Sequence, residues 1–285
     1  MKVVLPEKNK IKKRQLILYI VIMVVCIISV IIAFYVQFYA RIDIGRLIGF
    51  DTQGEFGKKT EEQIALLQTE FDQIFTNRFE NPEDVETKKI EEDKPIIYTK
   101  TEKKESKLNS YDLEVHIPYI NIDNTIIETY NKEIEQFVNK TNNILQSQNK
   151  NTIYTVEYVA NVQNDILSLM IRSNLKEGSS AQRVIIETYN YDLRNNKEIT
   201  LEEVLRIQGL NNLDIQKKIQ NEIETEQRKV EDLKNLGYNI YSRDITNDRY
   251  ELKNTKQFYL TENTLYIIYA YGNETFTSEM DLIII

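Results

Sequence analysis

The sequence predicts an α+β protein in which antiparallel sheets pack with helices, preceded by a single N-terminal transmembrane helix. Three observations support this prediction. Residues 16–40 contain no charged side chain. Short alternating segments typical of strands recur from residue 113 to the end of the sequence, and amphipathic helical segments fall between some of them. Because strands and helices occur in separate runs rather than in strict alternation, the sheets are expected to be antiparallel.

The apolar run of residues 16–40 is long enough to cross a membrane, since a helix of about 20 apolar residues spans the hydrocarbon core. A lone spanning segment must be helical to satisfy its own backbone hydrogen bonds. Tyr35, Phe38 and Tyr39 lie at its far end, where aromatic rings favour the headgroup level. A cleaved signal peptide would have a shorter apolar run and a small residue where Phe38 stands. The run is therefore predicted to be an uncleaved signal anchor.

The flanks of this run predict its orientation. Residues 1–15 carry six cations and one acid and are expected to be a basic cytoplasmic tail. The protein is thus predicted to be a single-pass protein of the cell membrane, with its C-terminal part extracellular. The net charge of the whole chain is −8 and residues 1–40 carry +5, which leaves −13 for the remainder. Such an acidic outer part would repel nucleic acid and favour cationic partners.

Residues 41–80 are predicted to form a juxtamembrane helical segment. Thr60 and Gln63 form a capping box, and four apolar residues then recur at heptad-like spacing, namely Ile64, Leu67, Phe71 and Ile74. This helix over residues 60–79 is expected to pack on the outer domain, with a homodimer through residues 60–79 as an open alternative. Residues 81–109 are highly charged and are predicted to be a solvated linker, with a short strand at its middle as an open alternative.

Two outer α+β domains are predicted, at residues 110–182 and 183–285. The first has a strand at 113–117 ended by Pro118, a helix from about Thr125 to Leu145, and strands at 154–158 and 166–171 joined by a turn at 161–165. The second has a strand at 183–193, a capped helix at 201–206, a helix around Ile215, Ile219 and Ile223, and strands at 257–260, 265–271 and 276–285.

No catalytic residue, metal site or cofactor motif is predicted. His116 is the one histidine and falls on the polar face of its strand, and Cys26 is the one cysteine and lies in the apolar run. A thiol nucleophile and a cysteine-ligated zinc in the outer part are therefore excluded. Paired carboxylates such as Glu61-Glu62 and Glu202-Glu203 stand at helix starts, where solvated acids are ordinary. An enzyme that uses these acids is the least favoured hypothesis.

Tyrosine is the most informative side chain for binding. Tyr189 and Tyr191 share one strand face, and Tyr269 and Tyr271 share another. Tyrosine is favoured at recognition surfaces because it buries a large area at low entropy cost. These four residues are the candidate partner-binding residues, although packing within the sheets would explain them as well.

Two stretches resemble a known family. The segment Arg183–Leu205, "RVIIETYNYDLRNNKEITLEEVL", and the later "FYLTENTLYIIYAYG" are similar to the outer domain of the lysozyme-receptor anti-sigma-V factors. The same module resembles the non-catalytic N-terminal region of membrane-anchored peptidoglycan deacetylases of Gram-positive bacteria. The preceding "YTVEYVANVQNDILSLMI" and "YNKEIEQFV" resemble the companion domain, so that the resemblance covers about residues 110–285. It implies a binding role that faces the cell envelope.

The leading hypothesis is therefore a membrane-anchored, envelope-exposed, non-enzymatic binding or sensor module. Its expected ligand is a cell-wall component or a cationic envelope protein such as a lysozyme. The alternative is a structural subunit of a membrane complex, joined to its partner through the helix over residues 60–79.

Overall fold

The computed structural model describes residues 23, 56–57, 59–80, 87–147 and 151–285. The described residues between 56 and 205 and between 210 and 285 belong to one compact unit. The predicted cytoplasmic tail and membrane span lie outside the described residues, apart from Met23. No helix within the described ranges is long and apolar enough to cross a membrane.

The unit is an α+β fold rich in antiparallel pairing, as the sequence predicts. Its elements run in the order α3 (Glu61–Glu70), η1 (Phe71–Ile74), β1 (Arg78–Glu80), β2 (Ile97–Lys107), β3 (Tyr111–Ile120), α4 (Thr125–Gln146), β4 (Thr152–Gln163), β5 (Ile166–Glu177), β6 (Arg183–Asp192), β7 (Lys197–Glu198), α5 (Leu201–Ile207), α6 (Asn212–Asn235), η2 (Asp248–Tyr250), η3 (Leu252–Asn254), β8 (Phe258–Leu260), β9 (Leu265–Ala270), η4 (Tyr271–Asn273) and β10 (Met280–Ile284).

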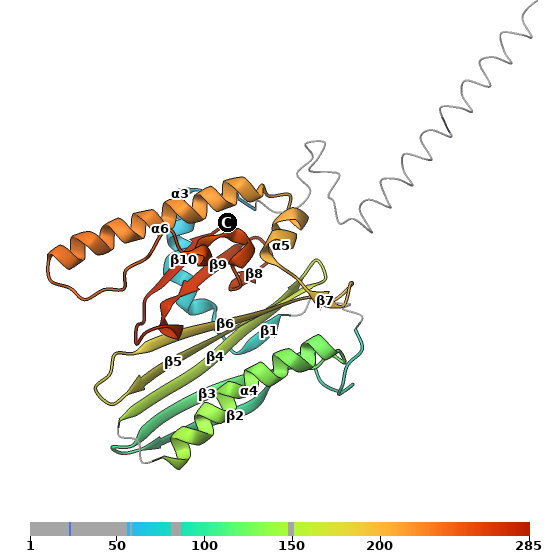
Figure 1. The fold of residues 1–285 in the computed structure, drawn as a ribbon. Helices are drawn as coiled ribbons and strands as arrows, with labels where there is room; N and C mark the ends of the chain where they lie inside the picture. Colours follow the sequence, from blue (N-terminus) through green and yellow to red (C-terminus); the bar gives the residue numbers. More distant parts are fainter. Residues whose placement is uncertain (1–22, 24–55, 58, 81–86, 148–150) are drawn as a thin grey trace, which may run out of the picture. The chain divides into compact units, whose positions relative to one another are not determined.

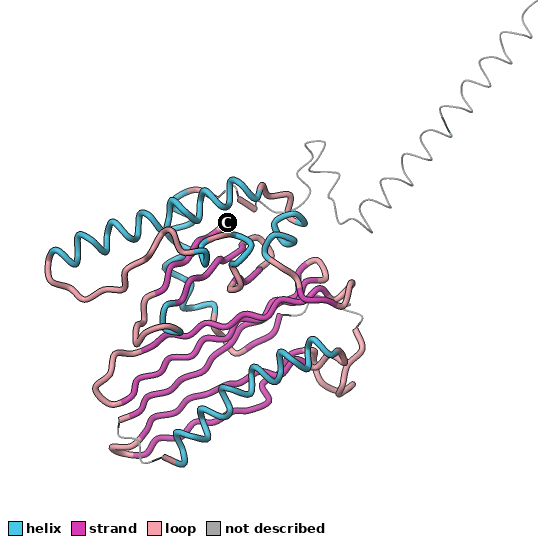
Figure 2. The backbone as a smooth tube through the Cα atoms, viewed as in Figure 1, coloured by secondary structure: helices cyan, strands magenta, loops and turns pink. Residues whose placement is uncertain are grey.

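The strands form two sheets. The larger has the order β2-β3-β4-β5-β6-β7, with β1 paired to β4, and the smaller has the order β10-β9-β8. Helix α4 covers one face of the large sheet, while the small sheet stacks on the other face and α6 lies beyond it (Figures 1 and 2). Two pairings are parallel, β1 with β4 and β3 with β4. The β3–β4 pair needs a crossover connection, and α4 is that connection.

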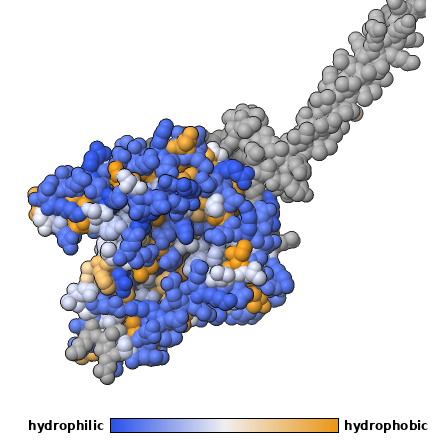
Figure 3. Space-filling view, viewed as in Figure 1, coloured by the Kyte–Doolittle hydropathy of each residue, from blue (hydrophilic) through white to orange (hydrophobic). Residues whose placement is uncertain are grey.

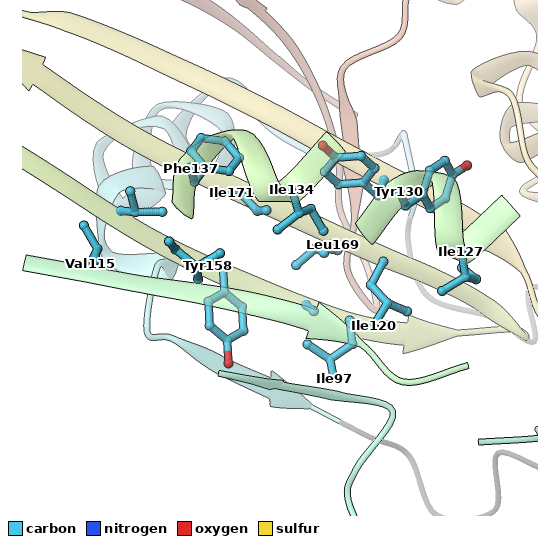
Figure 4. Packing of buried hydrophobic residues seen from close by; sticks show 14 of the residues in the cluster. Ile97, Val115, Ile120, Ile127, Tyr130, Ile134, Phe137, Tyr158, Leu169 and Ile171 are labelled. Carbon is cyan, nitrogen blue, oxygen red and sulfur yellow. The ribbon is translucent and has the colours of Figure 1, made fainter. Parts of the chain in front are cut away.

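Helix α4 forms because its sequence is both capped and amphipathic. The Asn124 side chain accepts a hydrogen bond of 2.8 Å from the Ile126 N–H, which satisfies one free donor at the helix start. The buried face carries Ile127, Tyr130, Ile134 and Phe137, and these side chains pack over Ile120, Leu169 and Ile171 of the sheet (Figure 4). Burying each large apolar side chain contributes about 1.5–3 kcal/mol.

A second core lies between the two sheets. It contains Met170 and Ile186 of the large sheet, Tyr266 and Ile268 of the small sheet, and Phe71 of η1. Ile64, Leu67 and Ile74 pack against this core, so the helix over residues 60–79 packs on its own domain, as the sequence analysis favoured. The apolar residues expected in a dimer seam are thus in contact with the same chain.

Several predicted boundaries are corrected by the structure. The helix expected over residues 60–79 ends at Ile74, and Arg78–Glu80 instead forms a strand. The predicted linker 81–109 contains β2, whose charged residues suit a strand at the edge of a sheet. The boundary proposed between residues 182 and 183 falls inside one sheet, because β5 and β6 are paired neighbours.

Pro118 does not end its strand. The pairing of β2 with β3 shifts between Thr99 and Thr101, opposite Pro118. Such a bulge accommodates a proline, which has no N–H to donate to the ladder. The predicted turn between β4 and β5 is confirmed and is tight, since Asn164 and Asp165 have φ values of 51° and 59°. Two consecutive left-handed residues are the geometry of a type I′ hairpin turn.

Candidate functional site

A groove of about 730 Å³ lies between the N-terminal half of α4, the edge strand β6 and the segment from η2 to β8. Tyr130 and Glu133 enter it from α4, which is placed there by the packing of its apolar face on the sheet. The end of β7 and the start of α5 contribute Glu198 and Glu202 to its lining. The capping box of α5 holds this connection in place, because the Glu203 side chain accepts a hydrogen bond of 3.1 Å from the Thr200 N–H.

Four carboxylates line this groove, those of Glu133, Glu187, Glu198 and Glu202. None of them forms an ion pair or a side-chain hydrogen bond with another residue in the part of the chain that the structure describes. The Glu187 side chain is half-buried beside Tyr189. Burial raises the pKa of Glu187 above the ordinary glutamate value, and the negative charge of Glu133 raises it further.

The cations that line the groove are mostly neutralised. Arg249 forms an ion pair with Glu274, and Lys253 forms one of 2.7 Å with Glu251. Lys256 has no ion-pair partner among the described residues. Among the described residues the groove therefore presents four carboxylates outside any ion pair against one such cation, Lys256, with Lys253 acting on Glu202 at longer range. Its net field favours a cation.

Tyrosine rings form much of the apolar wall. Tyr130 and Tyr189 are in contact, with ring centroids 5.0 Å apart, and Tyr269 lies against Tyr250 at the same centroid distance. Burial raises the pKa of the Tyr269 hydroxyl to about 12, although its hydrogen bond with Thr255 acts in the opposite direction. These phenols therefore remain neutral at physiological pH and offer ring faces rather than charge.

The four tyrosines predicted to bind a partner are not an exposed patch. Tyr189, Tyr191, Tyr269 and Tyr271 are 5%, 1%, 3% and 0% exposed. Strand positions between two covered faces bury aromatic side chains for packing, so the burial of these residues supports the packing explanation over an exposed patch. Two of the four, Tyr189 and Tyr269, still line the groove.

Tyr191 and Tyr271 have other surroundings. Tyr191 belongs to the core under α4. Tyr271 belongs to a buried polar cluster in which its hydroxyl donates to Asp281 and lies 2.9 Å from the Tyr250 hydroxyl. Arg243 donates two hydrogen bonds to the same carboxylate, of 2.8 and 2.7 Å. Because these groups satisfy one another, the cluster joins the 236–256 connection to β10 and leaves no free group to a ligand.

Glu187 and the carboxylates around it were not among the residues predicted from the sequence. A signal was available in the strand periodicity. Glu187 lies two residues before Tyr189 and four before Tyr191, so it shares the strand face that was predicted to carry the tyrosines. Glu133 and the residues of η3 could not be placed beside it, because they are distant in sequence. Within the described ranges there is no group of three or more His, Cys, Asp or Glu residues that could hold a metal ion. His116 lies partly exposed, 4.0 Å from Glu102.

Solved structures show partial similarities to the chain, among them two DUF3298 family proteins. No protein-family model matches the chain, and no curated protein matches it. A solved DUF3298 family member from Bacteroides fragilis is 12% identical, with 55% of this chain and 74% of that chain covered and a TM-score of 0.31. A DUF3298 family protein from Pseudomonas aeruginosa is 10% identical, with 62% and 82% covered and a TM-score of 0.35. Similarities at this level do not establish a family for the chain.

Proposed function

We propose that this protein is a non-enzymatic binding module that holds a cationic segment of a partner protein in the groove between α4 and β6. The observation that carries the proposal is the set of four unpaired carboxylates that face one groove beside tyrosine rings. Of the two ligand classes expected from the sequence, a cell-wall component and a cationic protein such as a lysozyme, this charge favours the cationic protein.

The groove provides three kinds of contact for a lysine or arginine side chain. Glu133 and Glu187 attract its positive charge. The attraction to Glu187 is the stronger of the two, because a partly buried carboxylate lacks full hydration. The rings of Tyr130 and Tyr189 offer apolar surface for the methylene stem. The backbone of Thr188 on β6 offers a hydrogen-bond donor and an acceptor. Figure 3 shows a mostly hydrophilic surface with small separate apolar patches, which favours polar over hydrophobic docking on that face.

The proposed setting is the outer side of a cell membrane. The charge-free run of residues 16–40 with its basic flank supports a single-pass anchor with a cytoplasmic N-terminus. The resemblance of residues 183–205 and 258–272 to the outer domain of lysozyme-receptor anti-sigma-V factors supports a ligand-binding role for the domain outside. An anchored acidic groove of this kind would sense or retain a basic protein that reaches the envelope.

The proposal is tested by binding of lysozyme to the full chain in lipid nanodiscs, measured by interferometry at two salt concentrations. The double variant Glu133→Gln with Glu187→Gln should bind at least tenfold more weakly, which corresponds to about 1.4 kcal/mol. The matched control is Glu135→Gln with Glu224→Gln, since these exposed glutamates lie on α4 and α6 but do not line the groove. Equal affinity of the two double variants would contradict the proposal, and so would retention of acidic wall fragments in place of lysozyme.

A further inference from the structure

Strand β6 is an edge of the large sheet along most of its length. It pairs with β5 from Arg183 to Asp192, whereas its ladder with β7 on the other side comprises Tyr191 and Asp192. The side of β6 that faces away from β5 is therefore unpaired by a strand before Tyr191. This free side forms part of the groove, which residues 187–190 line.

The backbone groups on this free side belong to the even-numbered residues. The Val184 N–H donates to the Thr277 carbonyl at 3.2 Å, and the Asn190 carbonyl accepts from the Ile199 N–H at 3.3 Å. The Ile186 carbonyl accepts from the Gln257 side chain. In an antiparallel ladder every second residue directs both of its backbone groups to the same side. The N–H and C=O of Thr188 therefore also point away from β5.

Thr188 has these two groups available. Its side-chain hydroxyl is used, since it donates to the Lys256 carbonyl and accepts from the Phe258 N–H, both at 3.3 Å. Neither its backbone N–H nor its backbone C=O has a hydrogen-bond partner among the residues the structure describes. One donor and one acceptor on the same residue are what an added strand uses at each hydrogen-bonded position.

We infer that an extended segment of a cationic partner adds to the edge of β6 as a strand, with one of its residues paired to the backbone of Thr188. The inference rests on the proposed function and deepens it, because it specifies the conformation of the ligand. Charge complementarity argues for this occupant: Glu187 and Glu133 flank the free edge on the side of α4. Unpaired edges are recognised in this way by extended peptides.

The pairing dictates a side-chain pattern in the ligand. The ligand residue opposite Thr188 directs its side chain to the same face as Thr188, towards Lys256, so a small neutral residue fits there. The two residues beside it direct their side chains to the other face, next to Glu187 and Tyr189. The recognised triplet therefore has a lysine or arginine at one end, a small residue in the middle, and an aromatic or aliphatic residue at the other end.

The test uses the full chain in nanodiscs and a blocked pentapeptide with phenylalanine, serine and lysine in this order at its centre, because the antiparallel pairing places the residue after serine opposite Glu187 and the residue before it opposite Tyr189. A second peptide carries an N-methyl group on the serine amide, which removes the donor that would bond to the Thr188 carbonyl. We expect the first peptide to bind and the methylated one to bind at least tenfold more weakly by calorimetry. Amide hydrogen exchange at Thr188 should slow with the first peptide.

Protein variants give a matched comparison. Thr188→Pro deletes the edge N–H at a position where an edge strand tolerates proline, whereas Thr188→Val keeps the N–H and removes the hydroxyl. We expect Thr188→Pro to bind the first peptide at least tenfold more weakly than Thr188→Val does, since both variants lack the hydroxyl and differ in the edge N–H. The methylated peptide on wild-type protein tests the same pairing if Thr188→Pro does not fold.

The outcomes separate the two proposals. Equal binding of the two peptides, or no binding of either while lysozyme still binds through Glu133 and Glu187, overturns strand addition and leaves the proposed function intact. Loss of both peptide and lysozyme binding overturns both.

Discussion

The ion pair between Arg243 and Asp281 gives the sharpest test of how this fold is held together. Both side chains are almost completely buried, at 5% and 4% exposed. The guanidinium donates two hydrogen bonds to the carboxylate, of 2.8 and 2.7 Å, and Tyr271 donates a third. Replacement of Arg243 leaves the Asp281 carboxylate buried without a cation, and replacement of Asp281 leaves Arg243 with only its longer ion pair of 3.4 Å to Glu279. Loss of one partner of a buried pair costs about 3–5 kcal/mol.

We therefore expect Asp281→Leu and Arg243→Met each to lower the free energy of unfolding by about 3–5 kcal/mol. For a domain of this size, about 1 kcal/mol shifts Tm by roughly 2–4 °C, so each single variant should melt roughly 6–20 °C lower. The double variant removes both charges and replaces them with apolar groups, so it should recover most of this loss.

The assay is urea unfolding of the full chain followed by circular dichroism, with a double-mutant cycle between the two sites. Lys253→Gln is the control, because its ion pair with Glu251 is exposed, at 67% and 50%, and should contribute less than about 1 kcal/mol. Single variants at Arg243 and Asp281 that lose no more stability than this control would refute the expected cost of breaking the buried pair. A double variant whose loss equals the sum of the two single losses would refute the coupling between them.

Three further outcomes follow from the structure. Phe71→Ala should lower the free energy of unfolding in urea by about 3–5 kcal/mol, because Phe71 is buried in the core between the sheets. The loss should not depend on protein concentration, since Phe71 packs within its own chain. The control Leu66→Ala removes an exposed side chain and should cost less than about 0.5 kcal/mol. Thr60→Ala should cost about 1 kcal/mol through the lost capping box, measured in the same way. Because the pKa of Glu187 is raised above 4.5, the native state binds this proton more tightly than the unfolded state, and stability falls as pH rises from 4.5 to the native pKa. Glu187→Gln removes that loss, so unfolding curves at several pH values should show the variant gaining on wild type towards neutral pH; a constant difference would contradict the assignment.

Features that depend on near neighbours in sequence were predictable. The capping box at Thr200 and Glu203 is present in the structure, as are the amphipathic helix from Thr125 and the turn before Ile166. The reason is that caps, turns and helical faces are decided by residues at most a few positions apart. The α+β class followed from these local patterns taken in order.

Strand β2 and the end of β3 were harder to predict for a physical reason. The segment 97–107 carries so many charges that its composition is typical of a linker, yet pairing with β3 satisfies its backbone and leaves the charges at the sheet edge. Pro118 would end an isolated ladder, but a bulge lets the strand pass it. In both cases the partner strand, which the local sequence does not show, decides the outcome.

The candidate site was predictable only in part. The sequence by itself determined the acidic excess of residues 41–285 and the alternation that places Glu187 on the face of Tyr189. The tertiary structure decided that α4, β6 and the 249–256 segment meet around these residues. It also decided that Tyr189 and Tyr269 are walls of a groove rather than an exposed patch, and that the outward backbone N–H and C=O of Thr188 have no partner among the described residues. The physical reason is that burial and strand pairing depend on contacts between residues far apart in the chain, whereas charge and periodicity are properties of the chain itself.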